Sequence, residues 1–164
     1  AAPDTSWYLN GTLISPKSKR YGPGESTAGI HSCFAHSPFG AVFAAANAAA
    51  DIANAKVDKR AFLESRAART AGYAQALAEL ANEDEDSVGG VQFAGFRVDS
   101  ASPDPATVQL VVTATEGPNN GGLTAITYNV VWRAGDWQIV VPEDGVPVSS
   151  SVSSLNGYIP WSGS

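Results

Sequence analysis

The fold of this chain is decided by one stretch of sequence, SPFGAVFAAANAAA, which runs from Ser37 to Ala50. Ser37 suits the N-cap of a helix and Pro38 suits its first position, so we predict a helix from Pro38 to about Ala55. This helix carries almost no polar face, and a helix that is apolar all round is buried. Because Ala side chains are short, another element can approach its backbone closely. We therefore expect this helix at the centre of the fold, wrapped by a curved sheet.

A second helix is predicted from Lys59 to Ala81, with Asp58 as its N-cap. Its small and apolar residues recur at helical spacing and form one stripe, which is typical of a helix that packs by one face. Gly72 is a weak point in its interior. The acidic run at 83–86 opposes the dipole at a helix C-terminus, so it predicts a solvated loop.

From Val91 onward the pattern changes to the alternation of β-strands. Strands are predicted over residues 91–98, 107–115, 123–133 and 137–141. Gly95 between two out-of-phase phenylalanines indicates a β-bulge, and Trp132 and Trp137 flank a hairpin turn. Helices followed by an antiparallel meander give the α+β class.

The two ends of the chain differ from this body. Residues 1–27 are rich in Gly and Pro and predict an irregular N-terminal arm that packs on the α+β domain, residues 28–145. Residues 146–164 predict a Ser-rich flexible spacer followed by an aromatic segment. We expect that segment to fold back onto the body. The alternative is a partner-binding strand or peptide, for which Tyr158, Ile159 and Trp161 are the candidates.

Composition excludes several functions. The 164-residue chain has a formal charge of −6, which argues against direct nucleic-acid binding, because that requires a Lys/Arg surface. The single cysteine, Cys33, allows no intrachain disulfide. No apolar run reaches the roughly 18 residues of a membrane span. The sequence shows no signal peptide and contains no Met, so we expect a processed chain that touches a membrane only through a removed anchor.

The hairpin YNVVWRAGDWQI, residues 128–139, resembles the last hairpin of the NTF2-like superfamily, also called the cystatin-like cone. The segment AHSPFGA at 35–41, the Gly-Asp-Trp hairpin and the final GYIPW at 157–161 together look like a family of actinobacterial envelope proteins associated with conjugative elements. Their layout is similar to that of the NTF2-like periplasmic domains of conjugation machinery. The resemblance covers nearly the whole chain and carries no catalytic residues.

This resemblance implies an NTF2-like cone, in which the Ala-rich buried helix and the second helix pack on a curved antiparallel sheet. It also implies an extracytoplasmic, non-enzymatic domain that binds protein partners or itself, within a conjugative-transfer or secretion assembly. The alternative is an enzyme or small-molecule binder of the same fold, with a pocket between the helix at 38–55 and the sheet.

Five residues are candidates for lining such a pocket: His36, Asn47, Asp51, Tyr73 and Tyr128. Polar groups on a buried helix need hydrogen-bond partners. Asn47 and Asp51 therefore either cap the solvent-exposed end of the core or line a pocket. His36 either packs at the helix start or acts as a general base.

Two further candidates are His31 and Cys33, which share one face of a short strand and could form a base and nucleophile. A lone cysteine is more often a small buried hydrophobe. No spacing of Cys, His and Asp suggests a metal site, and no motif suggests a cofactor.

Overall fold

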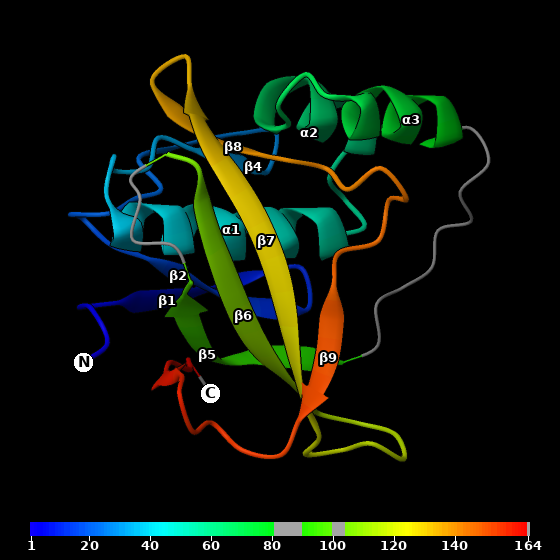
Figure 1. The fold of residues 1–164 in the computed structure, drawn as a ribbon. Helices are drawn as coiled ribbons and strands as arrows, with labels where there is room; N and C mark the ends of the chain where they lie inside the picture. Colours follow the sequence, from blue (N-terminus) through cyan, green and yellow to red (C-terminus); the bar gives the residue numbers. More distant parts are fainter. Residues whose placement is uncertain (81–89, 100–103, 164) are drawn as a thin grey trace.

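The computed structural model describes residues 1–80, 90–99 and 104–163. It is an α+β fold in which three helices pack with a curved antiparallel sheet (Figure 1). The helices are α1 (Pro38–Ala53), α2 (Lys59–Arg66) and α3 (Ala71–Glu79). The strands are β1 (Ser6–Asn10), β2 (Leu13–Lys17), β3 (Glu25–Thr27), β4 (Ile30–Ser32), β5 (Val91–Val98), β6 (Ala106–Ala114), β7 (Leu123–Arg133), β8 (Asp136–Ile139), β9 (Ser149–Val152) and β10 (Ile159–Pro160).

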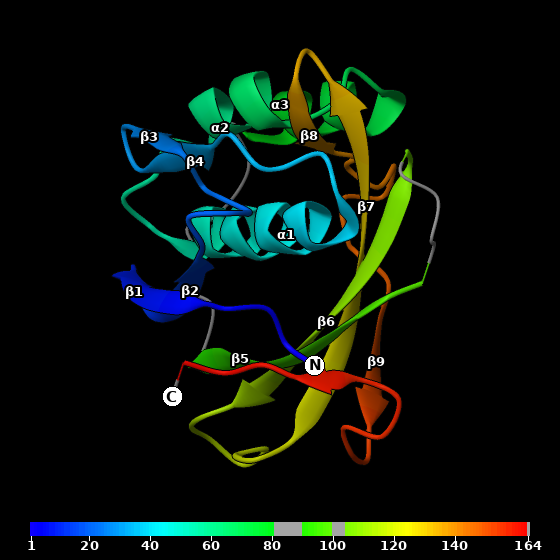
Figure 2. The same cartoon turned by 90° about the vertical axis from the view of Figure 1, so that its left-hand side faces the viewer.

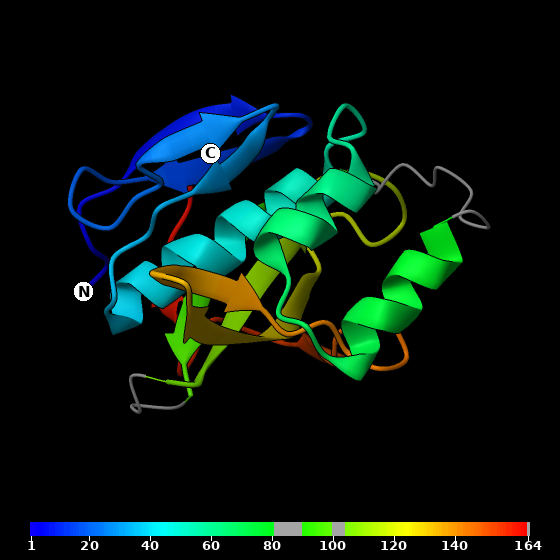
Figure 3. The same ribbon diagram turned by 90° about the horizontal axis from the view of Figure 1, so that it is seen from above.

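Helix α1 lies at the centre of three layers. Figure 2 shows it between two small hairpins on one side and the curved sheet on the other, and Figure 3 shows the same layers from above, with α2 and α3 beside them. The helix begins as predicted, because Ser37 Oγ accepts a hydrogen bond of 3.0 Å from the Gly40 amide. It ends at Ala53, two residues earlier than expected. Six of its eight alanines are buried, which confirms the central position.

The predicted second helix is wrong in one respect, because it is two helices. The chain leaves α2 after Arg66 and forms a parallel bridge from Ala67 to Ile139, with the Ala68 amide donating to the Ile139 carbonyl at 2.9 Å. Thr70 then caps α3. Gly72 is no simple weak point, since a Cβ there would lie 2.0 Å from the Val141 carbonyl oxygen. The expected helix end at residue 81 and the acidic run at 83–86 lie outside the described residues.

The main sheet has the strand order β10-β5-β6-β7-β8, and β9 also pairs with β7. The meander from β5 to β8 is antiparallel, as predicted. The register between β5 and β6 shifts between Phe93 and Gly95, which confirms the bulge. Trp132 and Trp137 face each other across the last hairpin, also as predicted.

The N-terminal arm is not irregular, which corrects the expectation for residues 1–27. It forms the hairpin β1–β2, and the segment that follows forms β3–β4. Gly11 occupies the first position of the β1–β2 turn at φ +64°. Ala28 and Gly29 both have positive φ in the β3–β4 turn. These are the turn geometries that suit the twist of two-residue hairpins.

The Ser-rich segment is likewise ordered rather than a flexible spacer. Residues Ser149–Val152 form β9 and pair with the first half of β7. The chain then returns along β5 as β10, so that the Trp161 amide donates to the Ala94 carbonyl at 2.9 Å. Serine side chains do not prevent strand pairing where backbone donors and acceptors of a neighbouring strand are free.

Candidate functional site

Asn47 lies on the side of α1 that faces the β1–β2 hairpin, and it is fully buried. Its amide nitrogen donates to the carbonyls of Pro16 and Phe43, both at 2.9 Å. Its carbonyl oxygen accepts hydrogen bonds from the hydroxyls of Tyr8 and Ser15. Every hydrogen-bonding position of this amide is therefore used within the protein.

Asp51 lies one helical turn further along and is also fully buried. Its carboxylate accepts from Asn10 Nδ2 at 2.8 Å and from the His31 amide at 2.9 Å. The ring nitrogen His31 Nδ1 lies 2.7 Å from Asp51 Oδ1. Asn54, at the end of the helix, donates to Asn10 Oδ1 at 2.9 Å. This polar ladder of α1, formed by Asn47, Asp51 and Asn54, fixes both N-terminal hairpins to the helix.

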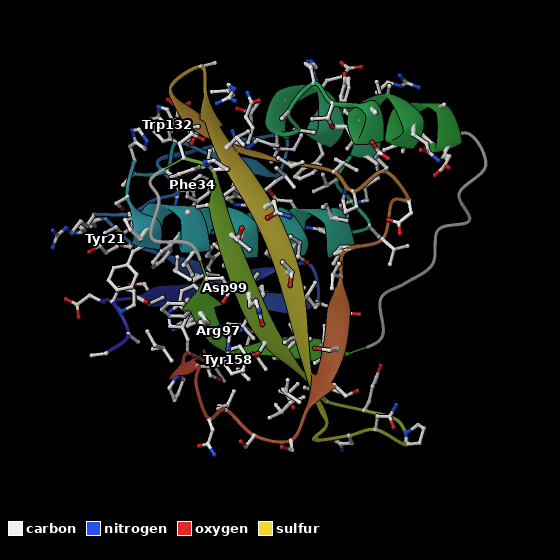
Figure 4. The ribbon with its side chains drawn as sticks, in the orientation of Figure 1. Tyr21, Phe34, Arg97, Asp99, Trp132 and Tyr158 are labelled. Carbon is white, nitrogen blue, oxygen red and sulfur yellow. The ribbon has the colours of Figure 1, made fainter. Side chains whose placement is uncertain are left out.

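The other three pocket candidates lie apart from this ladder. His36 is exposed and stacks on Trp132, with ring centroids 4.0 Å apart and planes 3° apart; Figure 4 shows Trp132 near the β7–β8 turn. Tyr73 on α3 packs beneath the guanidinium of Arg69, 4.3 Å from its ring centroid. Tyr128 lies opposite Val108 in the sheet, and burial raises its pKa to about 12.

Among the residues that the structure describes, one surface depression with polar walls lies between the two hairpins. It has a volume of about 300 Å³ and is open to solvent. Its walls are Tyr8, Lys17, Pro23, Gly24, Glu25, Ser26 and His31. Burial is the main cause that raises the pKa of Tyr8 to about 12, and the nearby Asp51 charge adds to it. Of the predicted residues, only His31 borders this hairpin depression.

The second depression, of about 360 Å³, is mostly apolar. Arg20, Tyr21, Ser37, Pro38 and Phe39 line it at the start of α1. The Tyr21 ring lies edge-on to Phe39 and stacks on Phe43, which explains why the aromatic residues of this arm are ordered. The five residues predicted to line a pocket contribute to neither depression.

Sequence reasoning missed the role of Asp136 at the β7–β8 turn. Its carboxylate accepts from the amides of Cys33 and Phe34 at 2.7 and 3.0 Å, and it forms an ion pair with Arg66 at 2.9 Å. Asp136 thereby joins α2, the last hairpin and the segment after β4. The only sequence signal was its place in the Gly-Asp-Trp turn, which gave no hint of partners so distant along the chain.

Cys33 follows β4 with φ at +69°, and its side chain is exposed. It therefore does not continue the strand face that was expected to hold it beside His31. Among the residues that the structure describes, the Cys33 thiol contacts Ser32 Oγ at 3.9 Å and forms no hydrogen bond with His31. This geometry does not support a Cys–His nucleophile.

The aromatic C-terminal segment folds back onto the body. Trp161 is 4% exposed and its Nε1 donates to Thr5 Oγ1 at 2.9 Å. Ile159 lies opposite Phe96 in β5. Tyr158 donates to Gln109 at 2.9 Å and packs against Arg97, which in turn bonds Asp99 at 2.6 Å. Figure 4 shows Tyr158, Arg97 and Asp99 together at this edge of the sheet.

No metal or membrane element emerges from the described parts of the chain. Residues 1–80, 90–99 and 104–163 contain no group of three or more acidic, His or Cys side chains placed to hold a metal ion. None of the helices in these ranges is long and apolar enough to cross a membrane.

The architecture and the internal polar ladder define an α+β domain whose polar residues largely hold its own layers together. A family model described as "Domain of unknown function (DUF8175)" matches residues 1–160. The chain belongs to this family. No curated protein and no solved structure matches it.

Proposed function

We propose that this chain is a non-enzymatic protein-interaction domain with an NTF2-like cone fold. It acts outside the cytoplasm, in the cell envelope or as a secreted domain, as part of a conjugative-transfer or secretion assembly. The location, the assembly and the cone rest on the resemblance to actinobacterial envelope proteins. The curved sheet around a buried Ala-rich helix is compatible with that resemblance.

The use of polar residues supports a binding role over an enzymatic one. Asn47 and Asp51 of α1 are saturated by hydrogen bonds, and all but one of these bonds are to the N-terminal hairpins. Ala41, Phe43, Ala45 and Ala48 are buried in the core, which leaves little room for a substrate between α1 and the sheet. An active site requires titratable groups that converge on a cavity, and the five predicted pocket residues do not converge.

The observation that carries the proposal is the outer edge of β9. Within the described residues, β9 pairs with β7 and with no other strand. Proteins usually blunt such an edge with charged residues, bulges or a covering element. Here the strand is Ser-Ser-Ser-Val, and the preceding Val146 and Val148 are 66% and 75% exposed. An uncharged edge beside exposed apolar side chains suits an extended segment of a partner protein, which would add to the sheet as a further strand.

The register identifies which backbone groups such a segment would use. The Thr127 amide donates to the Val148 carbonyl at 2.8 Å, and Ser150 lies opposite Ala125. Because hydrogen-bonded pairs alternate in an antiparallel ladder, the backbone groups of Ser150 point to β7. The amides and carbonyls of Ser149 and Ser151 therefore point to the open edge.

This assignment provides a test with a matched control. A photoreactive side chain at Ser149 should cross-link one protein of defined mass in the cells that produce the domain, and the purified pair should reassemble. Ser151→Pro removes an outward amide, so it should abolish the cross-link while the melting temperature changes by only a few degrees. Ser151→Ala keeps the amide and should keep the cross-link.

The proposal fails if position 149 gives no discrete product, or if the product persists in Ser151→Pro. A native mass spectrum of the purified chain gives an independent check. A bare monomer or clean oligomer supports the interaction domain. A stoichiometric small-molecule adduct that vanishes in Asp51→Ala but persists in Lys17→Ala and Glu25→Ala would instead support the alternative, a binder or enzyme with its site at α1.

A further inference from the structure

The hairpin depression brings together four polar side chains, of which all but His31 have no hydrogen-bond or ion-pair partner among the described residues. They are Lys17 from β2, Glu25 and Ser26 from β3, and His31 from β4. Lys17, Glu25 and Ser26 are therefore available to a ligand.

The orientation of the His31 ring is fixed by the buried carboxylate of Asp51. Asp51 holds both its backbone amide and its Nδ1, and the ring lies 5.2 Å from the Tyr8 ring. Only 14% of the His31 side chain is exposed, and the residue borders the depression. Nε2 is consequently the ring nitrogen that can bond a ligand, and a buried carboxylate that holds the other nitrogen orients the ring for this.

Lys17 and Glu25 come from the two different hairpins and carry opposite charges. Lys17 Nζ lies 5.8 Å from the centre of the Tyr8 ring, and it forms no ion pair with Glu25 in the described structure. A simple anion near Lys17 would be repelled by Glu25, and a simple cation near Glu25 would be repelled by Lys17. A ligand with both charges satisfies both side chains at once.

We propose that the hairpin depression binds a small zwitterion, specifically a free α-amino acid. Its carboxylate lies between Lys17 Nζ and His31 Nε2, and its ammonium group bonds the Glu25 carboxylate. Ser26, which is opposite His31 in the hairpin register, supplies a hydroxyl on the same wall. The volume of about 300 Å³ is at the small end of ligand sites and is sufficient for a molecule of this size.

The test uses the imidazole signals of His31 in ¹⁵N–¹H NMR spectra, with L-alanine as the probe. The chain has two histidines, and His36 stacks on Trp132 away from the hairpin depression, so it is an internal reference. L-alanine should shift the His31 signals in a saturable manner and leave those of His36 unchanged. Acetate and methylammonium, each with one of the two charges, should bind at least severalfold more weakly.

Three variants complete the experiment. Lys17→Ala and Glu25→Ala should each weaken L-alanine binding by roughly 1.5- to fivefold, the range expected for exposed ion pairs. Lys19→Ala, an exposed lysine on the same arm, should not change it. A His31 that does not respond to L-alanine overturns the proposal. A response to acetate equal to that to L-alanine also overturns it, since the site would then be a plain anion site. This site is independent of the proposed edge interaction, so either can fail alone.

Discussion

The clearest prediction concerns Trp161, because one side chain near the C-terminus completes the core. Its ring centroid lies 5.1 Å from those of Trp7 and Phe96 and 5.2 Å from that of Phe43. Trp161→Ala would remove these contacts, leave a cavity among aromatic rings, and deprive Thr5 Oγ1 of its donor. The backbone bond from residue 161 to Ala94 would remain. The change therefore tests the side chain rather than the path of the chain.

Removing a buried aromatic side chain costs about 3–5 kcal/mol, including the cavity that remains. For a chain of this length, each kcal/mol shifts the melting temperature by about 2–4 °C, so we expect a decrease of roughly 6–20 °C. Domains are typically stable by about 5–15 kcal/mol, so the variant should still be mostly folded at room temperature.

Thermal and urea unfolding followed by circular dichroism would measure this effect. Trp161→Phe keeps a ring in the site and should lose clearly less stability than Trp161→Ala. Val148→Ala, at a residue 75% exposed, should change the free energy of unfolding by no more than about 0.5 kcal/mol. A loss below about 1 kcal/mol for Trp161→Ala would refute the argument and return the segment to the role of a partner-binding peptide.

Three further predictions follow from single contacts. Asp51→Ala strands the buried donors of Asn10 and His31 and should cost about 3–5 kcal/mol in urea unfolding, whereas a cost below 1 kcal/mol would mean that the ladder does not hold the hairpins. Gly72→Ala should lower the melting temperature, because the added Cβ would lie 2.0 Å from the Val141 carbonyl oxygen. Helix propensity alone predicts the opposite, a stability gain of about 1 kcal/mol, so an increase in melting temperature would refute the steric argument. The pKa values of Tyr8 and Tyr128 are raised to about 12 by burial, so the stability from their neutral forms is complete below pH 10 and is lost as the pH rises towards 12. An absorbance titration of tyrosinate should show two late-titrating groups, which Tyr8→Phe and Tyr128→Phe remove one at a time.

The parts of the fold that were predicted correctly depend on local signals. Residues close together in the sequence specify the helix start at Ser37-Pro38, the buried alanine run and the alternating strands. Two errors arose from long-range contacts. The break after α2 depends on Ile139, some seventy residues away, which takes up the backbone of Ala67 and Ala68. Strand β9 forms because the backbone groups at one edge of β7 are available for pairing. A run of serines contains no local signal for such a strand.

The first hairpin is a different kind of error, because its signal was in the sequence. Gly11 follows Asn10 between two apolar segments, a combination that favours a two-residue hairpin turn. The second hairpin gave weaker evidence, since Ala28 at φ +52° is a residue that seldom adopts this conformation. Only the surrounding structure, with Ile30 and His31 packed on α1, explains why an alanine is held there.

Of the candidate site, the sequence predicted only the residues on helix α1, and it did not predict their partners in the hairpins. The one-turn spacing of Asn47 and Asp51 on an otherwise apolar helix required polar partners, and the structure supplies them. The partners are Tyr8, Asn10 and His31, which lie in the two hairpins. The Gly and Pro content of this region had instead predicted an irregular arm. The sequence therefore indicated that these side chains had to be satisfied, but not that the same bonds would shape a depression on the far side of His31.

The arrangement of α1 explains how one domain can hold two separable sites. Its alanine face packs closely on the sheet, and its polar ladder holds the hairpins through directional bonds, which fix the hairpins in one position. Figure 2 shows the hairpins on one side of α1 and β9 beyond it on the side of the sheet. Changes at Lys17 or Glu25 therefore leave the β9 edge intact, and Ser151→Pro leaves the hairpin depression intact. If one variant abolished both activities, the two sites would have to be coupled through α1, and Asp51, which touches both hairpins, would be the residue at which to look for that coupling.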